Sequence, residues 1–551
     1  MPIVTFPKDK RCRNFAWVYE TTARRSFYVQ IFLRSRLRIM QTSVRTSFSK
    51  ILRGKAIVNQ ALVFKEKKFR SLSIRTYQGG TSANYEFAKF LNSRLQFKKR
   101  CISSRQPQSV QRVHLDDGSQ ILSAELLLEK ENVMVKMVNQ GKYLPGSNTD
   151  VENQQFPFVW LRDNCQCPKC FHSEAFSRTM QMLDFDINCR PASLKVSEDK
   201  TSITFFWQDG HESTFKADWL SERAFTPRAR ALRLIDYRGN RVLWDARDFK
   251  RINEDESAQS WRFSYSDIMS KDSSLLAWLE YLETMGVALV VGSNPSNGQL
   301  RRLAHRASFV RRTHYGELFS VRAKDEPSNL AYTSEKLQLH TDLPYYEYKP
   351  GVNMLQCLVQ WKGPGGENHL VDSFAVAELM RHEHPNEYNI LSTTLVDWAD
   401  IGQEPEGVDD DSGVHEGKRE RRAFHSIYRA PVICEDREGY IVRVNVSQPQ
   451  RDSHFCVKLS QVSTWYAAFN LFAQLLHSPR YCVTYKLKPG EILTFDNLRV
   501  CHGRGAYGSS EGISESLERH VKGAYMDWDE IRSRIRTLRK SVSLENESKV
   551  S

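Results

Sequence analysis

The chain has 551 residues, of which 40% are hydrophobic and 26% are charged, a composition typical of globular proteins and unlike that of disordered or fibrous ones. A usual domain holds about 100–200 residues, so the length predicts more than one domain. The formal net charge of +14 is concentrated at one end: residues 1–105 hold 24 Lys and Arg against 4 Asp and Glu, whereas residues 106–551 hold 55 against 61. A mildly acidic body argues against a nucleic-acid partner. No run of 18 apolar residues occurs, which argues against a membrane span.

The basic segment, residues 1–106, has the composition of a targeting signal or a tail. It is rich in Arg and Ser and contains no acidic residue between Glu20 and Glu66, which is typical of a mitochondrial transit peptide. A disordered basic tail would have the same composition, so a mitochondrial and a cytoplasmic location both stay open. The most apolar stretch, residues 27–40, is interrupted by three arginines and does not resemble a secretory signal.

Short alternating apolar runs begin near residue 107 and predict a small β-rich domain over residues 107–230. Its expected strands cover residues 123–128, 133–138 and 201–207, and the last of them is closed by the turn-forming pair Asp209-Gly210. The charged stretch that follows predicts a linker over residues 231–262.

A larger domain is expected over residues 263–545. Helical spacing of apolar residues predicts a helix at 264–285, and the apolar run directly after it predicts a buried strand. Many short apolar runs separated by Pro and Gly follow, such as 482–487 and 492–495, and they predict a sandwich, a barrel or a jelly roll. Residues 402–425 are rich in charged residues and are expected to form a solvated insertion.

The tripeptide His340-Thr341-Asp342 has the spacing of a metal site. On an extended strand residues i and i+2 point to the same face, so His340 and Asp342 can present a nitrogen and an oxygen to one ion. A second histidine would complete a facial triad of two histidines and one carboxylate, the ligand set of non-haem iron oxygenases. His502, which follows a predicted strand and turn, is the expected third ligand.

A second group of metal-binding residue types is Cys165-x-Cys167-x2-Cys170, followed by His211 after a predicted strand. The chain has 11 cysteines, and a tight cluster of them in a sequence without a secretory signal favours metal binding over disulfides. Three thiolates and one imidazole are the ligands of a closed, structural zinc site. The sequence therefore predicts a zinc ion that stabilises the small domain and performs no catalysis, with incidental buried cysteines as the alternative.

Three motifs that follow one another along the chain resemble those of a known enzyme family. They are His340-Thr341-Asp342-Leu343-Pro344, residues 365–372 (GGENHLVD) and residues 495–504 (FDNLRVCHGR). In this order they resemble the iron- and 2-oxoglutarate-dependent dioxygenases of the taurine dioxygenase type. With residues 160–165 (WLRDNC) upstream, the similarity narrows to the γ-butyrobetaine dioxygenase family, which includes trimethyllysine dioxygenase, and it covers about residues 107–545.

The resemblance implies a mainly β fold, with a small zinc-binding β-rich domain followed by a catalytic double-stranded β-helix, a variant of the jelly roll. It implies that the triad named above holds Fe(II). It places Arg519 on the distal carboxylate of 2-oxoglutarate, which a planar guanidinium can bind through two parallel hydrogen bonds. It also implies contacts of Arg504 and Asn368 with this cosubstrate.

A trimethylammonium group cannot donate a hydrogen bond, so its recognition depends on cation–π contacts with an aromatic cage. The resemblance places the cage at Tyr315, Phe319 and Tyr332, with Asn329 and Tyr525 nearby. Phe319 stands where the butyrobetaine enzyme has Trp, and Leu343 stands where that enzyme has Tyr. The second replacement removes a polar aromatic contact from the expected substrate site.

The activity implied by the resemblance is hydroxylation of γ-butyrobetaine to L-carnitine, the last step of carnitine biosynthesis, with O2 and 2-oxoglutarate as cosubstrates and ascorbate as the supporting reductant. Hydroxylation of N6-trimethyllysine or another trimethylammonium compound is the alternative, which Leu343 and a mitochondrial location would favour. A non-catalytic relative that binds a quaternary ammonium ligand is a third reading. Because the family is often dimeric, a homodimer is expected.

Overall fold

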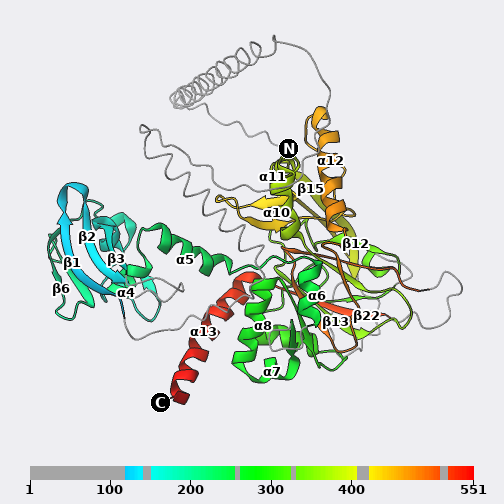
Figure 1. Ribbon diagram of the computed structural model, residues 1–551, viewed down its shortest axis with the longest axis horizontal. Helices are drawn as coiled ribbons and strands as arrows, with labels where there is room; N and C mark the ends of the chain where they lie inside the picture. The colour runs from blue at the N-terminus through cyan, green and yellow to red at the C-terminus, as the bar shows by residue number, and fades with distance from the viewer. Residues whose placement is uncertain are drawn as a thin grey trace, which may run out of the picture. The chain divides into compact units, whose positions relative to one another are not determined.

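The computed structural model of the chain describes residues 118–139, 150–254, 261–323, 330–405, 421–508 and 519–550 (Figure 1). The basic segment 1–106 and the expected substrate residue Asn329 lie outside the described residues, so what was predicted for them stays a prediction. The described strands form two groups, one before residue 217 and one after residue 261.

The first group contains two three-stranded antiparallel sheets, ordered β1-β2-β3 and β6-β7-β8. Their strands are β1 Gln120–Leu127, β2 Asn132–Asn139, β3 Asp150–Pro157, β6 Pro191–Val196, β7 Ser202–Trp207 and β8 Glu212–Lys216. Alternate side chains of β7 are buried, as expected for a strand with one face on a core. In that core Val133 and Phe156 of one sheet join Ile203 and Phe205 of the other. The three strands predicted here are present, with ends shifted by at most about three residues.

The second group contains a six-stranded sheet, β11-β22-β13-β20-β10-β9, and a four-stranded sheet, β12-β21-β14-β19. Their strands are β9 Arg262–Ser264, β10 Val287–Val291, β11 Leu318–Val321, β12 Leu337–His340, β13 Val352–Val359, β14 Asn368–Asp372, β19 Val483–Tyr485, β20 Ile492–Asp496, β21 Val500–Arg504 and β22 His520–Met526. The strands β11 to β14 and β19 to β22 contribute four to each sheet and pair antiparallel within it. This is the topology of a double-stranded β-helix, and the predicted jelly roll is confirmed.

A hydrophobic core lies between these two sheets. Leu355 of β13 and Phe495 of β20 enter it from the six-stranded sheet, and Leu370 of β14 and Val500 of β21 enter it from the four-stranded sheet. Each such side chain contributes about 1.5–3 kcal/mol when fully buried. The core therefore fixes the spacing of the strands that carry the candidate site residues.

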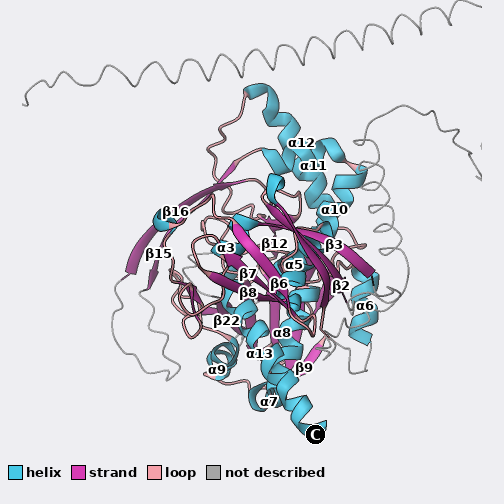
Figure 2. Ribbon diagram, turned by 90° about the vertical axis from the view of Figure 1, so that its left-hand side faces the viewer, coloured by secondary structure: helices cyan, strands magenta, loops and turns pink. Residues whose placement is uncertain are grey.

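Helices cover the six-stranded sheet on the side away from this core. They are α7 Tyr265–Ser270, α8 Asp272–Met285, α9 Gln299–Ala307 and α13 Trp528–Val550. Leu279 of α8 and Ile531 of α13 pack in one cluster with Val290 of β10, and α8 lies beside α13 in both views (Figures 1 and 2).

A second group of helices contains α10 Ser373–Glu383, α11 Pro385–Thr393 and α12 Leu459–Leu476 (Figure 2). Leu391 of α11 and Trp465 of α12 share a core with Val371 of β14. None of the helices in the described ranges combines the length and the apolar character that crossing a membrane requires.

The helix predicted at 264–285 is interrupted in the structure. Ser264 caps α7, because its side chain accepts a hydrogen bond from the Asp267 N–H, and Lys271 is extended between α7 and α8. Gly286 ends α8 in the left-handed region with φ 76°. A Cβ atom at this position would lie 3.0 Å from the Arg499 side chain, so both the conformation and the close approach favour glycine.

The described parts of the predicted linker, 231–254 and 261–262, contribute to the folded core. They include the end of α5 Pro227–Arg238 and all of α6 Ala246–Glu254. Trp244, Phe249 and Trp261 are buried together with Leu289 of β10. Among the described charged residues here, Arg247, Lys250 and Arg251 are exposed, and the three aromatic side chains supply the buried contacts.

The two ends of the predicted insertion at 402–425 belong to a long antiparallel strand pair. Its strands are β15 Val396–Pro405 and β16 Arg421–Ala430, which pair over ten residues each. A shorter pair follows, β17 Ile433–Glu435 and β18 Ile441–Val444. The described ends of the predicted insertion are therefore strands.

Candidate active site

The two histidines of the predicted triad lie on adjacent antiparallel strands. His340 is the last residue of β12 and pairs directly with His502 of β21, while Asp342 follows two residues after His340. Asp342 Oδ1 lies 3.1 Å from His340 Nε2 and 3.7 Å from His502 Nε2. Strand pairing thus brings together residues that are far apart in the sequence, and one ligand atom of each residue lies within 4.8 Å of the others.

Hydrogen bonds and burial orient the three side chains. His340 Nδ1–H donates to the Gln338 carbonyl at 2.8 Å, which leaves Nε2 as the metal-binding nitrogen. Burial lowers the pKa of His502 to about 3, so this imidazole is neutral and can act as a ligand. Burial alone would raise the pKa of Asp342, but the neighbouring histidines and the Tyr525 hydroxyl hold it below its ordinary value, so the carboxylate is ionised.

Three further residues fix the position of Asp342. Its Oδ2 accepts hydrogen bonds from Asn353 Nδ2 at 2.6 Å and from the Tyr525 hydroxyl at 2.9 Å. Asn497 holds the main chain on both sides, since its Oδ1 accepts from the Asp342 N–H and its Nδ2 donates to the Asp342 carbonyl. Asn353 and Asn497 were not among the predicted site residues. The sequence holds a signal for Asn353, because it is a polar residue within the apolar run of β13.

This arrangement fits a resident Fe(II) ion. Two neutral imidazole nitrogens and one carboxylate oxygen converge, while the second oxygen of Asp342 is used by protein donors. Two histidines and one carboxylate leave open coordination positions, as an oxygenase requires. His340, Asp342 and His502 would hold the ion.

A cavity of about 130 Å³ opens at the triad, and Arg519 lines it. This side chain is only 4% exposed, and its buried Nε has no hydrogen-bond partner among the described residues. Burial lowers the pKa of Arg519, but a guanidinium stays charged in proteins. A buried cation with unused donors is stabilised by an anion, so the geometry favours a carboxylate here.

Arg504 also lines the cavity but has other partners. Its terminal nitrogens donate to three main-chain carbonyls within residues 331–335, and burial and the neighbouring Arg519 lower its pKa to about 10. The predicted contact with 2-oxoglutarate is therefore open only to its Nε, which lacks a partner within the described ranges. The main role seen is to hold the segment that carries Tyr332.

Asn368, the first residue of β14, lines the cavity and is 5% exposed. Its Nδ2 donates to the Tyr485 carbonyl on β19 at 3.2 Å. The side-chain amide is thus anchored to the neighbouring strand, beside the position predicted for the cosubstrate.

Aromatic side chains are among the residues that line the same cavity, as the predicted cage requires. Tyr315, Phe319, Tyr332 and Tyr525 are among its lining residues. The Tyr315 and Phe319 ring centroids are 6.1 Å apart, and Phe319 stacks on Tyr525 at 5.0 Å. Leu343 lines the cavity too, in the left-handed region with φ 55°, a conformation that costs a non-glycine residue about 1–2 kcal/mol.

One predicted substrate residue, Tyr525, also contacts the metal-binding carboxylate. The Tyr525 hydroxyl is bound to Asp342, so this residue positions the metal ligand and contributes only its ring to the aromatic wall. The cavity also has lining residues that the sequence analysis did not single out, including Lys336, Tyr345, Ser447 and Gln450.

The cysteine cluster is assembled as the sequence predicts. Cys165, Cys167 and Cys170 follow α3 Phe158–Asp163, and the turn between β7 and β8 presents His211 to them. His211 Nε2 lies 3.2, 3.6 and 3.6 Å from the three sulfurs. Zn–S bonds of about 2.3 Å and a Zn–N bond of about 2.0–2.1 Å in a tetrahedron would separate sulfur and nitrogen by about 3.6 Å.

Arg162 lies beside this cluster. It donates to Cys170 Sγ at 3.5 Å and pairs with Asp209 at 3.2 Å. Burial raises the pKa of Cys165 to about 11. The residue types and the sulfur–nitrogen distances fit a tetrahedral ion, whose binding would displace the thiol protons.

Comparisons with known proteins agree with this geometry. Residues 248–525 match the family described as Taurine catabolism dioxygenase TauD, TfdA family, and residues 135–221 match Gamma-butyrobetaine hydroxylase-like, N-terminal. The gamma-butyrobetaine dioxygenase of Homo sapiens is 34% identical over 400 residues, 71% of this chain and 93% of that protein. The enzyme of the same name from Pseudomonas sp. (strain AK-1) is 31% identical over 401 residues, 72% of this chain and 94% of that protein.

The mitochondrial trimethyllysine dioxygenase of Homo sapiens is also similar, at 27% identity over 387 residues, 70% of this chain and 83% of that protein. The match to the TauD, TfdA family covers the double-stranded β-helix and all three triad residues. The chain therefore belongs to the γ-butyrobetaine dioxygenase family and is an iron- and 2-oxoglutarate-dependent dioxygenase.

Proposed function

We propose that the chain hydroxylates γ-butyrobetaine to L-carnitine. The observation that carries the proposal is the wall of Tyr315, Phe319 and Tyr332 in the cavity at the triad. Aromatic faces bind a desolvated quaternary ammonium ion through cation–π contacts, which suits a substrate with a trimethylammonium group. The gamma-butyrobetaine dioxygenases at 31–34% identity support this choice of substrate.

The bound iron, together with 2-oxoglutarate and O2, would supply an oxidant strong enough to hydroxylate an unactivated C–H bond. One oxygen atom would enter the substrate and the other would enter succinate, with release of CO2. The chain's own residues place the reactants: the triad holds the ion, Arg519 binds the distal carboxylate and the aromatic wall holds the cation. Such positioning is the main contribution of a protein to cofactor chemistry.

Hydroxylation of N6-trimethyllysine is the second candidate. Leu343 lines the cavity. The resemblance implies a Tyr at this position in the butyrobetaine enzyme, so a polar aromatic contact expected for that enzyme's substrate is missing here. Trimethyllysine dioxygenases are the more distant relatives, at 26–27% identity. The non-catalytic reading loses its basis, because the family assignment, the assembled triad and Arg519 all belong to an oxygenase.

We further propose that the cysteine cluster holds a structural zinc ion. The support is the near-tetrahedral spacing of His211 Nε2 from three sulfurs and the presence of Arg162 beside them. A closed set of four protein ligands leaves no position for substrate, so this ion would stabilise the fold around it. For the hydroxylation itself, we propose ascorbate as the supporting reductant. We also propose that the chain forms a homodimer in solution.

A substrate panel tests the proposed function. The purified chain would receive Fe(II), ascorbate, 2-oxoglutarate and O2, with γ-butyrobetaine and trimethyllysine in parallel reactions, and products would be identified by mass spectrometry. His340→Ala is the matched control, since it removes one ligand of the triad and should abolish both turnover and iron binding.

Carnitine formed by the wild type and not by the control would support the proposal. Hydroxytrimethyllysine as the sole hydroxylated product would replace it with the second candidate. Succinate formed without either product would mean that the cavity accepts a different substrate. Turnover retained by His340→Ala would contradict the assignment of the triad.

A further inference from the structure

A tight turn presents Tyr315 to the aromatic wall. The turn runs from Thr313 to Gly316, and its two ends exchange main-chain hydrogen bonds of 2.9 and 3.0 Å. The Tyr315 N–H also donates to Thr313 Oγ1 at 3.2 Å. Gly316 closes the turn with φ 95°, a conformation that favours glycine. The turn therefore fixes the main chain of its two central residues, His314 and Tyr315.

Tyr346 fastens this turn to the segment that follows the triad residue Asp342. Its hydroxyl accepts a hydrogen bond from the His314 N–H at 3.1 Å and lies 2.8 Å from His314 Nδ1. The Tyr346 N–H donates to the Leu343 carbonyl at 3.1 Å, so the chain between Asp342 and Tyr346 is itself folded into a turn. The contact between His314 and Tyr346 thus joins the turn that carries Tyr315 to the segment that carries a metal ligand.

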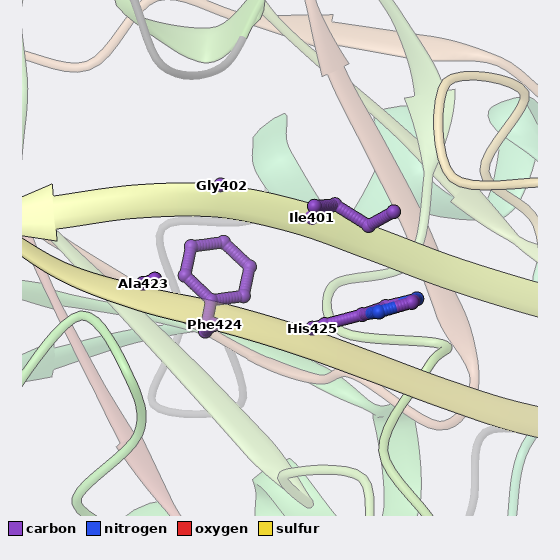
Figure 3. A pocket seen from close by; sticks show the side chains of 5 residues that line it. All are labelled: Ile401, Gly402, Ala423, Phe424 and His425. Carbon is purple, nitrogen blue, oxygen red and sulfur yellow. The ribbon is translucent and has the colours of Figure 1, made fainter.

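The His314 ring packs against two other rings. Its centroid lies 3.9 Å from that of Tyr315 and 4.1 Å from that of Phe424. Phe424 belongs to β16, and its ring extends toward Gly402 of β15 (Figure 3). A Cβ atom at Gly402 would lie 2.9 Å from two carbons of the Phe424 ring, so glycine leaves room for this ring. The β15–β16 pair therefore packs against His314, which in turn packs against the aromatic wall.

Both ring nitrogens of His314 face hydroxyl groups. Nδ1 faces Tyr346, and Nε2 lies 3.5 Å from the hydroxyl of Tyr345, which is 2% exposed and lines the cavity. Burial lowers the pKa of His314 to about 4, so the imidazole is neutral, with one nitrogen that donates and one that accepts. A hydroxyl can do either, so both nitrogens have a matching partner. His314 can thus act on the substrate through Tyr315 and Tyr345, which line the cavity.

We propose that His314 is a positioning residue that fixes the distance between the aromatic wall and the iron site, and so selects the methylene group that is hydroxylated. The wall holds the cation, so the carbon that reacts is the one that this distance places at the iron. Neighbouring carbons of a chain are about 1.5 Å apart, and a misplacement of about 1 Å can lower a rate about 100-fold. The inference deepens the proposed function and rests on it.

Paramagnetic relaxation measures this distance directly. The full chain would be loaded with 2-oxoglutarate and with Mn(II), a paramagnetic ion that carboxylate ligands also bind. The relaxation rate of the methyl protons of bound γ-butyrobetaine falls steeply with their distance from the ion. His314→Phe keeps a ring between Tyr315 and Phe424 but removes both nitrogens, so this rate should depart from that of the wild type. The dissociation constant of γ-butyrobetaine, measured by calorimetry, should rise roughly fivefold, as for the loss of a neutral hydrogen bond.

Turnover with Fe(II), O2, 2-oxoglutarate and ascorbate gives a second measurement. In His314→Phe, part of the product should carry its hydroxyl group on a carbon next to the one used by the wild type. More succinate should form for each hydroxylated molecule, with ascorbate oxidised in place of the substrate. Mass spectrometry and NMR would measure both ratios. A loss of folded enzyme alone would lower total turnover and leave the two ratios unchanged.

Two further variants make the result specific. Tyr346→Phe removes the other half of the contact and should have the same effects. The double variant should be no worse than His314→Phe alone, because two residues that act through one contact are not additive. Tyr265→Phe is the matched control, since its hydroxyl donates to the Gln299 carbonyl at 3.2 Å and it is not among the residues that line the cavity. If His314→Phe fails to fold, Tyr346→Phe carries the test.

Wild-type relaxation rates and product positions in His314→Phe and Tyr346→Phe would overturn the inference and leave the proposed function intact. Effects that multiply in the double variant would also overturn it, because they would show two independent contacts. A wild type that hydroxylates trimethyllysine but not γ-butyrobetaine would overturn the proposed function itself.

Discussion

The Asp342 side chain has two roles, one for each of its carboxylate oxygens. Its Oδ1 faces the two histidines, and its Oδ2 accepts hydrogen bonds from Asn353 and Tyr525. Groups that hydrogen-bond to a metal ligand fix its orientation and tune its affinity for the ion. The residues behind Asp342 should therefore matter for iron binding although they do not touch the iron.

Tyr525→Phe tests this role. The variant keeps the ring that stacks on Phe319 and removes the hydrogen bond to Asp342. The concentration of Fe(II) needed for half-maximal turnover should rise about 10-fold, as for other groups that orient metal ligands. Tyr388→Phe is the matched control, because this tyrosine bonds Glu435 and Arg381 instead. Equal iron affinity in wild type and Tyr525→Phe would show that Asn353 alone suffices.

Arg519→Gln tests the anion site. Loss of a buried, charge-assisted contact costs about 1.5–3 kcal/mol, so the KM for 2-oxoglutarate should rise roughly 10- to 100-fold. Steady-state kinetics at saturating γ-butyrobetaine would measure it. The exposed Arg480→Gln should leave this constant unchanged. A normal KM in Arg519→Gln would assign the cosubstrate carboxylate to another residue.

Lys349 gives a prediction about pH and stability. It is 6% exposed, and its Nζ donates to the Val444 carbonyl. Burial, with Arg443 nearby, lowers its pKa to about 7 from an ordinary value of 10.5. Between these values the unfolded chain binds more protons, so this group's contribution to stability is fully present above pH 10.5 and is lost as the pH falls through about 7.

Lys349→Met should therefore be more stable than the wild type at pH 7, and the difference should shrink as the pH rises toward 10. Denaturant unfolding at several pH values measures this. The exposed Lys488→Met should follow the wild-type curve. A Lys349→Met variant that is less stable at pH 7 would show that the charged amine is well solvated in the folded state.

At the scale of elements, one buried ion pair joins several segments. Arg499, just before β21, donates two hydrogen bonds to Asp372 at the end of β14, and both side chains are fully buried. Arg499 also donates to the carbonyls of Thr284 and Val242, while Asp372 caps α10. The pair thus connects α8 and the segment before α6 to β14 and to β21, the strand that carries His502.

Asp372→Asn would leave the Arg499 charge buried without its carboxylate. Breaking one side of such a pair costs about 3–5 kcal/mol, which denaturant unfolding would detect. Asp248→Asn removes a carboxylate, 40% exposed, from its pair with the more exposed Arg251, and its effect should stay below about 1 kcal/mol. Similar small effects in both variants would mean that Arg499 finds other acceptors.

At the scale of the whole molecule, the chain combines a metal site for catalysis with a second one expected to be structural. Cys167→Ser should lower the zinc content and the melting temperature, because a ligand of the closed site is lost. Hydroxylation per folded molecule should persist. Metal analysis, thermal unfolding and turnover would be compared with Cys456→Ser, an exposed cysteine outside the cluster. Normal zinc content in Cys167→Ser would remove the proposed zinc site.

The basic segment bears on where in the cell the protein is located. Its net charge of +20 over residues 1–105 supports the proposal of a mitochondrial location, with a cytoplasmic one as the alternative. A mature N-terminus found by mass spectrometry after about residue 50 would support import. An intact Met1 would oppose it.

Local sequence patterns determined much of the strand content and the residues of both candidate metal sites. The H-x-D spacing, the cysteine spacing and the short apolar strands depend on neighbouring residues, and the structure assembles the triad and the cysteine cluster from them. The double-stranded β-helix follows from the same short strands and from the motifs shared with the family.

Only the tertiary structure decided which polar groups meet. Asn497 and Tyr525 contact Asp342 across 155 and 183 residues of chain, and the carbonyls that occupy Arg504 lie 169 to 173 residues away. The burial of Trp244 and Trp261 in a charged segment is likewise set by contacts with distant strands. Hydrogen bonding and burial depend on what packs around a side chain in space, and a sequence pattern records only the neighbours along the chain.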